Sequence, residues 1–96
     1  MKRWWALLGL LPLAAGAADI GRGAELYGRH CAGCHGANGR PVLPGAPDLS
    51  RPTALLRPDL ALLATVRAGK GGMPGFAGLL RDREILDVVA HLRTLR

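Results

Sequence analysis

The segment Cys31-Ala32-Gly33-Cys34-His35 contains both cysteines of the chain, and a histidine directly follows the second one. In an exported protein, C-x-x-C-H spacing is typical of a site at which haem is attached through two thioether bonds. Two cysteines three positions apart on a helical turn can reach the two vinyl groups on one edge of a porphyrin. We therefore expect one haem c per chain, bound to Cys31 and Cys34, with His35 as a ligand of its iron.

Three other uses of the cysteine pair are possible. A disulfide between Cys31 and Cys34 would close a very short loop and would constrain the unfolded chain little. A thioredoxin-like redox pair belongs in a β-α-β context, whereas apolar residues here recur at helical spacing. Zinc takes four ligands, and beyond His35 only His30 and His91 remain. Haem attachment is therefore the interpretation that the spacing favours.

Met73 is the candidate for the second axial ligand of the iron. Beyond residues 1–18 it is the only methionine, and it lies between Gly72 and Pro74 in a loop. A methionine that serves only packing usually lies on an apolar helix face, although a loop methionine that covers apolar surface is the alternative. A His/Met ligand pair raises the reduction potential relative to two histidines.

Two histidines compete with Met73 for this position. His30 directly precedes Cys31, so its side chain points elsewhere on the helix than the side chain of His35. His91 lies one position before Leu92, a member of an apolar helical stripe, and a lone histidine there is more often a boundary residue. We therefore expect His35 and Met73 to be the metal ligands.

The chain has 96 residues and a formal net charge of +6, which allows one domain and excludes two-domain enzymes. Outside residues 1–18, Tyr27 and Phe76 are the only aromatic residues. A core this small and poor in rings is marginal without a disulfide, a metal or a cofactor. Haem would therefore supply much of the missing core.

Residues 1–18 have the layout of a secretory signal peptide, with Lys2 and Arg3 before an apolar stretch that ends in small residues. We expect cleavage after Ala17 or Ala18, and retention as an N-terminal anchor is the alternative. The apolar run is short for a membrane span, and no cysteine follows for a lipid anchor. The expected product is residues 19–96, in the periplasm and without stable membrane insertion.

Three helices separated by loops rich in glycine and proline predict an all-α fold. The first is expected over residues 20–34, with Asp19 as N-cap. The second is expected from Pro58 to Ala68, with proline at its first position, after a possible short turn over residues 53–56. The third is expected from Asp82 to Leu95. The expected apolar faces are Ile20, Ala24, Tyr27 and Cys31 on the first helix, and Ile85, Val88, Val89, Leu92 and Leu95 on the third.

These features together resemble the class I cytochromes c in their small bacterial monohaem form, over residues 19–96. Members carry a glycine and, four positions later, an aromatic residue before C-x-x-C-H, as Gly23 and Tyr27 do here. They also carry a Pro-x-Leu segment after the histidine, matched by Pro47-Asp48-Leu49, and a ligand methionine before proline, matched by Met73-Pro74. The resemblance implies about three main helices and long loops around one covalently attached haem.

The resemblance also implies roles for single residues. The Pro47 carbonyl would accept a hydrogen bond from the second ring nitrogen of His35, which fixes the ring, and Leu49 would press on the haem face. Gly23, which lacks a side chain, would let the last helix cross the first closely. Both Pro47 and Leu49 are therefore candidate cofactor-binding residues.

The chain departs from the family pattern at three places. His91 stands where relatives often carry an aromatic residue at the helix crossing. Arg81 stands where a serine or threonine often caps the last helix, so we expect Asp82 to cap it. Residues 19–96 lack tryptophan, so a basic residue is expected to pair with the haem propionates, the candidates being Arg40, Arg51 and Lys70.

A haem with both axial positions filled predicts an electron carrier in the periplasm rather than an enzyme. Arg29, Arg67 and Lys70 are expected to face an acidic redox partner, because complementary charge raises association rates. The alternatives are a ligand-binding or catalytic haem protein with a labile sixth ligand, and a haem subunit of a respiratory reductase. Lys70 is the only charged residue in segment 69–80, which disfavours catalysis there. Nucleic-acid binding is disfavoured by export.

Overall fold

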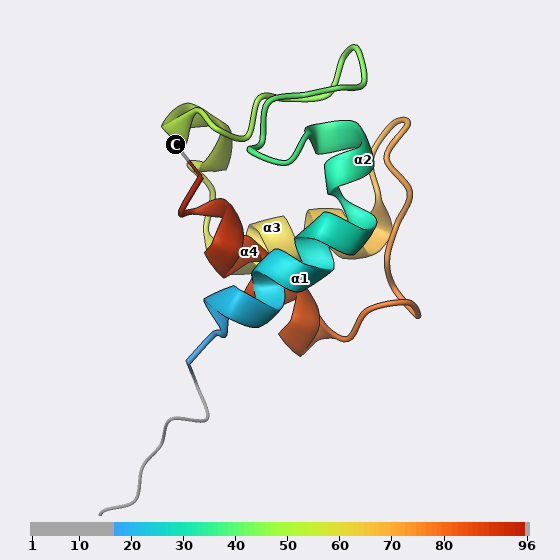
Figure 1. Ribbon diagram of the computed structural model, residues 1–96. Coiled ribbons are helices and arrows are strands. Elements are labelled where there is room, and N and C mark those ends of the chain that lie inside the picture. Colours follow the sequence, from blue (N-terminus) through green and yellow to red (C-terminus); the bar gives the residue numbers. More distant parts are fainter. Residues whose placement is uncertain (1–16, 96) are drawn as a thin grey trace, which may run out of the picture.

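A computed structural model of the chain describes residues 17–95, so nearly all of the expected signal peptide lies outside the described residues. The chain forms the helices α1 (Ile20–His30), α3 (Asp59–Ala68) and α4 (Asp82–Leu92), with short turns α2 (Ala32–His35) and η3 (Pro52–Leu55) (Figure 1). Within residues 17–95, β-structure is limited to two isolated bridges. The prediction of an all-α fold with three main helices is confirmed. No helix in this range is both long and apolar enough to cross a membrane.

Helix α1 begins as the sequence predicts, with the Asp19 carboxylate accepting the backbone N–H of Arg22 at 2.9 Å. The prediction of one helix over residues 20–34 is wrong, because the helix breaks at Cys31. The N–H of Cys31 still donates to the carbonyl of Tyr27, but its φ of −119° is far from the usual helical value of about −63°, while its ψ of −34° remains helical. Cys34 and His35 are therefore carried on the separate turn α2, which ends at Gly36.

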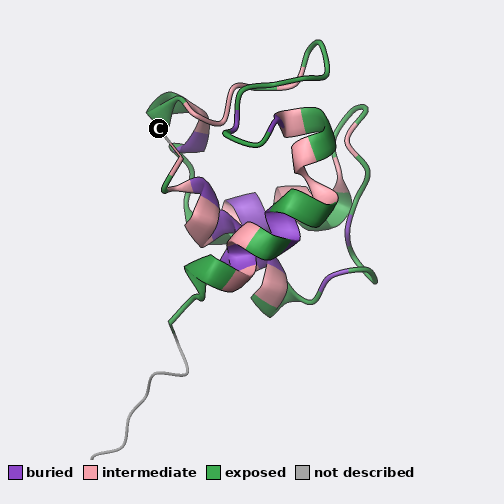
Figure 2. Ribbon diagram, viewed as in Figure 1, coloured by how far each residue is buried: buried purple, intermediate pink, exposed green. Residues whose placement is uncertain are grey.

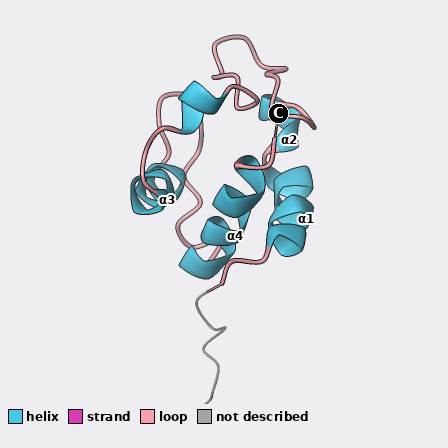
Figure 3. Cartoon of the chain, turned by 90° about the vertical axis from the view of Figure 1, so that its left-hand side faces the viewer, coloured by secondary structure: helices cyan, strands magenta, loops and turns pink. Residues whose placement is uncertain are grey.

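The close crossing of α1 and α4 is the centre of the fold (Figure 3). A Cβ atom on Gly23 would overlap the carbonyl oxygen of Asp87, so only glycine fits at the crossing. The Asp87 side chain is buried at 4% exposure, and its carboxylate accepts the backbone N–H of Asp19 at 2.8 Å. The ring of His91 lies 5.2 Å from that of Tyr27, so the contact is made without the family's usual aromatic residue.

The core lies where α1, α3 and α4 meet (Figure 2). The predicted stripe of α4 is confirmed, since its apolar members up to Leu92 are buried. The predicted face of α1 is partly wrong: Ile20 is 49% exposed, while Leu26, next to Tyr27, is buried. The crossing at Gly23 sets which side of α1 faces the core, and the residues three and four positions later follow it inward.

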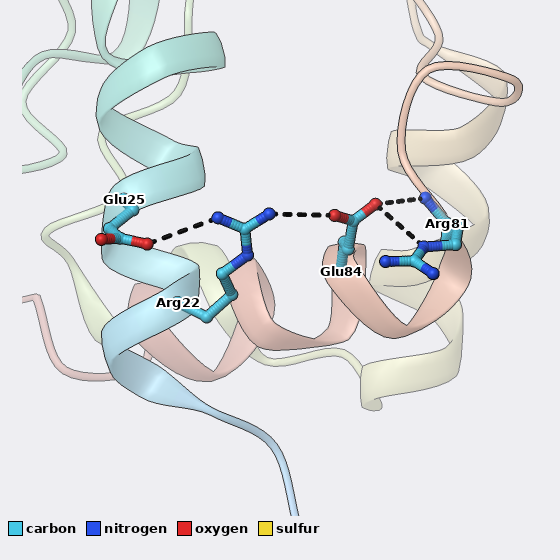
Figure 4. A network of polar contacts seen from close by, with 4 residues as sticks. All are labelled: Arg22, Glu25, Arg81 and Glu84. Carbon is cyan, nitrogen blue, oxygen red and sulfur yellow. Dashed lines mark hydrogen bonds and ion pairs between the residues drawn. The ribbon is translucent and has the colours of Figure 1, made fainter.

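The ends of two helices also differ from the sequence prediction. Arg81, and not Asp82, is the N-cap of α4, because Glu84 accepts the backbone N–H of Arg81 at 2.9 Å. Glu84 also pairs with Arg22 of α1 at 3.3 Å, which ties the start of α4 to α1 (Figure 4). Pro58 is the N-cap of α3 rather than its first residue.

Helix α4 ends at Leu92 instead of Leu95, and the next residue fixes it to the rest of the chain. The Arg93 guanidinium donates to the carbonyls of Leu55 and Arg57 and to the Asp59 carboxylate, with distances of 2.7–2.9 Å. These bonds hold the junction between η3 and α3 against the end of α4. The long loop that precedes η3 is therefore anchored at its C-terminal end.

Two glycines of α1 give a matched test of this packing. Gly23→Ala is expected to destabilise the haem-containing protein by about 1–3 kcal/mol, because the methyl group forces α4 away. A Cβ atom on Gly28 meets nothing within 4 Å, so Gly28→Ala is expected to stabilise by up to about 1 kcal/mol through helix propensity. Denaturant unfolding measures both. Equal effects of the two substitutions would contradict the proposed crossing.

Candidate haem site

The C-x-x-C-H segment begins at the end of α1 and continues through α2. Cys31 is partly buried and Cys34 is exposed. The ring of His35 is partly buried, and its Nδ1 atom is buried without a hydrogen-bond partner. Burial lowers the pKa of His35, which favours the neutral imidazole that can ligate a metal. A neutral ring beside two cysteines fits the donor set of a haem c site.

The structure around the cysteines disfavours two of their other possible uses, as a thioredoxin-like redox pair and as zinc ligands. Burial raises the pKa of the Cys31 thiol to about 11, whereas a thioredoxin-like pair needs a lowered pKa to form its thiolate. Zinc would need further ligands close by. No three His, Cys, Asp or Glu side chains gather as a metal site anywhere in residues 17–95.

The loop after His35 is folded back on itself by two glycines. Gly36 has a φ of 82° and Gly39 a φ of 86°, both in the region that favours glycine. The N–H of Leu49 donates to the carbonyl of Gly39 at 2.8 Å, which brings the Pro47–Leu49 segment next to this turn. The structure records no bond from His35 Nδ1 to the Pro47 carbonyl, so that bond stays a prediction.

The Met73 loop is held tightly against the end of α3. Lys70 and Met73 exchange two backbone hydrogen bonds of 2.9 and 3.0 Å, which close a narrow turn. A side chain on Gly69 would collide with the backbone of this loop, and one on Gly75 would collide with the carbonyl of Arg67. These two glycines therefore let the loop approach α3, which fixes where Met73 lies.

The predicted site residues come from three separate segments that surround one side of the helical core (Figure 1). Cys31, Leu49 and Met73 are all partly buried and pack against the same cluster of buried side chains.

A shallow groove of about 460 Å³ is lined mainly by α3, and none of the predicted site residues lines it. Its lining residues are Leu60, Leu63, Ala64, Arg67, Ala68 and Ala77.

The remaining candidate residues fall into two groups. His30 lies with its ring 6.1 Å from that of Phe76, and His91 packs on Tyr27, so each rival ligand has a packing contact. Arg51 pairs with Asp48 at 3.5 Å, and the charge of Arg67 is balanced by Asp82 at 2.9 Å. Arg40 and Lys70 are exposed, and the described residues offer neither of them an acidic partner within ion-pair distance.

The sequence did not predict the contacts that three residues, Gly69, Gly75 and Tyr27, make at the site. Gly69 and Gly75 position Met73, and the signal for them was the run of glycines around Met73-Pro74. The hydroxyl of Tyr27 donates to the carbonyl of Gly36 at 2.6 Å. No sequence signal predicts this bond, because any aromatic ring satisfies the pattern before C-x-x-C-H.

Comparison with known proteins agrees with this geometry. The family model described as "Cytochrome C oxidase, cbb3-type, subunit III" matches residues 18–92. Cytochrome c6 of Thermosynechococcus vestitus is 38% identical over 91 residues, covering 91% of this chain and 80% of that protein. Cytochrome c6 of Parathermosynechococcus lividus is 35% identical over 79 residues, covering 78% and 88%.

Two solved structures have the same fold. The KustC0563 c-type cytochrome superposes with a TM-score of 0.72 at 25% identity, covering 77% of this chain and 96% of that one. Cytochrome c6 of the diatom Phaeodactylum tricornutum has a TM-score of 0.65 at 32% identity, with coverages of 78% and 91%. The chain therefore belongs to the family of small monohaem c-type cytochromes, and its cofactor is haem c attached through Cys31 and Cys34.

Proposed function

We propose that residues 19–96 are a periplasmic electron carrier in which His35 and Met73 are the axial ligands of one haem c. One observation carries this proposal: Met73 lies in a tight turn next to Gly69 and Gly75, and it packs against the same core cluster as Cys31. The likeness to cytochromes c6 supports the role in electron transfer. The test is the visible spectrum of the oxidised protein, in which a methionine ligand gives a weak band at about 695 nm.

The bound haem would supply a one-electron couple at its iron, and the chain supplies its surroundings. His35 and Met73 would fill both axial positions, which leaves no position for a substrate. The backbone bonds between Lys70 and Met73 fix the Met73 backbone in a turn, and the Met73 side chain packs against the core cluster. Fixed ligands favour rapid electron transfer because little has to move when the charge changes.

The proposed docking surface consists of the exposed residues Val42 and Leu43 beside Cys34 and the basic residues Arg29 and Lys70. The N–H groups of Val42 and Leu43 donate to the carbonyl of Cys34, and these two side chains are 67% and 47% exposed. Arg29 and Lys70 are exposed basic residues that would face an acidic redox partner. Arg67 is left out of this surface, because Asp82 already pairs with it.

Exchange of the two basic residues for acids tests the docking surface. For the variant R29E/K70E, oxidation of the reduced protein by the anion ferricyanide is expected to slow roughly two- to tenfold at low salt. Oxidation by a cationic cobalt complex is expected to accelerate, and high salt should remove both effects because it screens exposed charges. Stopped-flow absorbance measures these rates.

The matched control is Arg83→Glu, which reverses an exposed charge on α4. We expect this change to affect both oxidants less per unit charge than R29E/K70E does. An equal effect per charge would show that net charge alone steers the encounter. That result would contradict a docking surface beside Cys34.

Export rests on the signal-peptide layout of residues 1–18 and is likewise a proposal. Expression of the full chain in a bacterium that attaches haem c, followed by mass spectrometry of the periplasmic fraction, tests it. We expect a haem-containing product that begins at Ala18 or Asp19. A haem-containing product that keeps residues 1–18 would support an anchored protein instead.

A second candidate function is a haem subunit of a respiratory complex. The matching family description, which names a subunit of an oxidase, favours this candidate. Size-exclusion chromatography of a detergent extract of whole cells of the native host, followed by haem staining, separates the two candidates. A free carrier elutes at the size of a single small chain, whereas a subunit elutes with a large complex.

A further inference from the structure

The hydroxyl of Tyr27 connects α1 with the loop that follows the haem-binding motif. Its side chain is 2% exposed, and the hydroxyl donates to the carbonyl of Gly36 at 2.6 Å. Gly36 directly follows His35 in the chain. A hydrogen bond to this carbonyl therefore restrains the backbone at the residue next to the expected ligand.

The turn that begins at Gly36 is narrow. The carbonyl of Gly36 also accepts the N–H of Gly39 at 3.2 Å. A Cβ atom on Gly36 would overlap the carbonyl oxygen of Arg40, so the chain reverses tightly here. Two donors thus meet at one carbonyl, and Tyr27 is the donor that comes from a helix of the core.

The position of the phenol is set by the helix crossing. The Tyr27 ring lies 5.2 Å from the His91 ring of α4, at an interplanar angle of 56°. Burial is the main cause that raises the pKa of Tyr27 to about 12, so the hydroxyl stays protonated at neutral pH. The hydroxyl is therefore a permanent donor, held in place by both α1 and α4.

We propose that Tyr27 is a positioning residue for the His35 ligand, because its hydroxyl holds the Gly36 carbonyl and so fixes the backbone at His35. This inference rests on the proposed function, in which His35 binds the iron. It extends that function by connecting the α1–α4 crossing to the ligand through one hydrogen bond. The aromatic ring alone, which phenylalanine would also supply, cannot make this connection.

Tyr27→Phe in the haem-containing protein tests the proposal, because it removes the hydroxyl and keeps the ring. Two readouts are recorded by NMR in the reduced state: amide exchange along the chain and the ring-proton signals of His35. We expect exchange at Gly39 to accelerate roughly tenfold, the factor that corresponds to a hydrogen bond of ordinary net strength. We also expect the His35 signals to shift and the reduction potential to change measurably.

The matched control is Thr65→Val. The Thr65 hydroxyl donates to the carbonyl of Ala61 at 3.2 Å, so this variant also loses one side-chain bond to the backbone, on α3. We expect the control to leave the His35 signals and the reduction potential unchanged. Changes of equal size in the control would overturn the proposal, since any lost bond would then have the same effect.

The outcomes for Tyr27→Phe separate positioning from general stability. Faster exchange confined to the turn around Gly39, together with shifted His35 signals, supports the proposal. Uniformly faster exchange with unchanged His35 signals overturns it, and so does a variant identical to the wild type. The NMR spectrum of the wild-type protein tests the proposed function separately. If its His35 ring signals show no ligation to the iron, the proposed function is wrong, whatever the variants show.

Discussion

Replacing both cysteines by serine is expected to leave a chain that does not fold. In C31S/C34S no thioether can form, and the porphyrin that completes the core is lost. The protein core that remains contains the rings of only Tyr27 and Phe76 among its buried residues. A small domain has only about 5–15 kcal/mol of stability, so the loss of a large part of its core is enough to unfold it.

The measurement is far-ultraviolet circular dichroism with thermal unfolding, accompanied by mass spectrometry to detect covalent haem. We expect the double variant to lose most of its helical signal and its cooperative transition. The variants C31S and C34S are the controls, since each keeps one thioether and should retain haem more weakly than the wild type. A double variant that melts cooperatively with native helical content would show that the polypeptide folds without its cofactor.

Replacing Met73 by alanine is expected to produce the second large effect, on the haem and not on the fold. Because the haem iron loses its methionine ligand, its reduction potential should fall by on the order of 0.1 V, within the roughly 0.8 V range that axial ligands span. The open position should then bind carbon monoxide in the reduced state. The glycine contacts of Gly69 and Gly75 remain, so the loop should keep its path.

Potentiometric titration and carbon monoxide difference spectra measure this change. Leu79→Ala is the matched control, because Leu79 lies in the same loop region and is 60% exposed. We expect it to leave both the potential and carbon monoxide binding unchanged. If Met73→Ala behaves like this control, then Met73 is a packing residue and the second ligand lies elsewhere.

Much of the fold could be predicted from spacing because apolar periodicity reports burial directly. The stripe that includes Ile85 and Val88 on α4 follows from apolar periodicity, and the glycine at the helix crossing follows from the family resemblance. The break at Cys31 could not be predicted, since it depends on one φ angle within a run of helix-compatible residues. The cap of α4 was missed because Glu84, three positions inside the helix, satisfies the N–H of Arg81.

The candidate site was predictable where a single residue type carries the chemistry. The C-x-x-C-H motif and a lone methionine between Gly72 and Pro74 are such signals. The contacts that hold these residues are made by backbone atoms, as at Gly69 and Gly75, and a sequence does not show which backbone segments meet. For the same reason the sequence could not show that Arg67 is already paired with Asp82.

The central claim, a low-spin haem c ligated by His35 and Met73, is tested most directly by the visible spectrum of the purified wild-type protein. In the oxidised state we predict a weak band at about 695 nm, the signature of a methionine–iron bond. In the reduced state we predict no change on addition of carbon monoxide. A high-spin oxidised spectrum without that band, with ready carbon monoxide binding after reduction, would contradict the electron-carrier account.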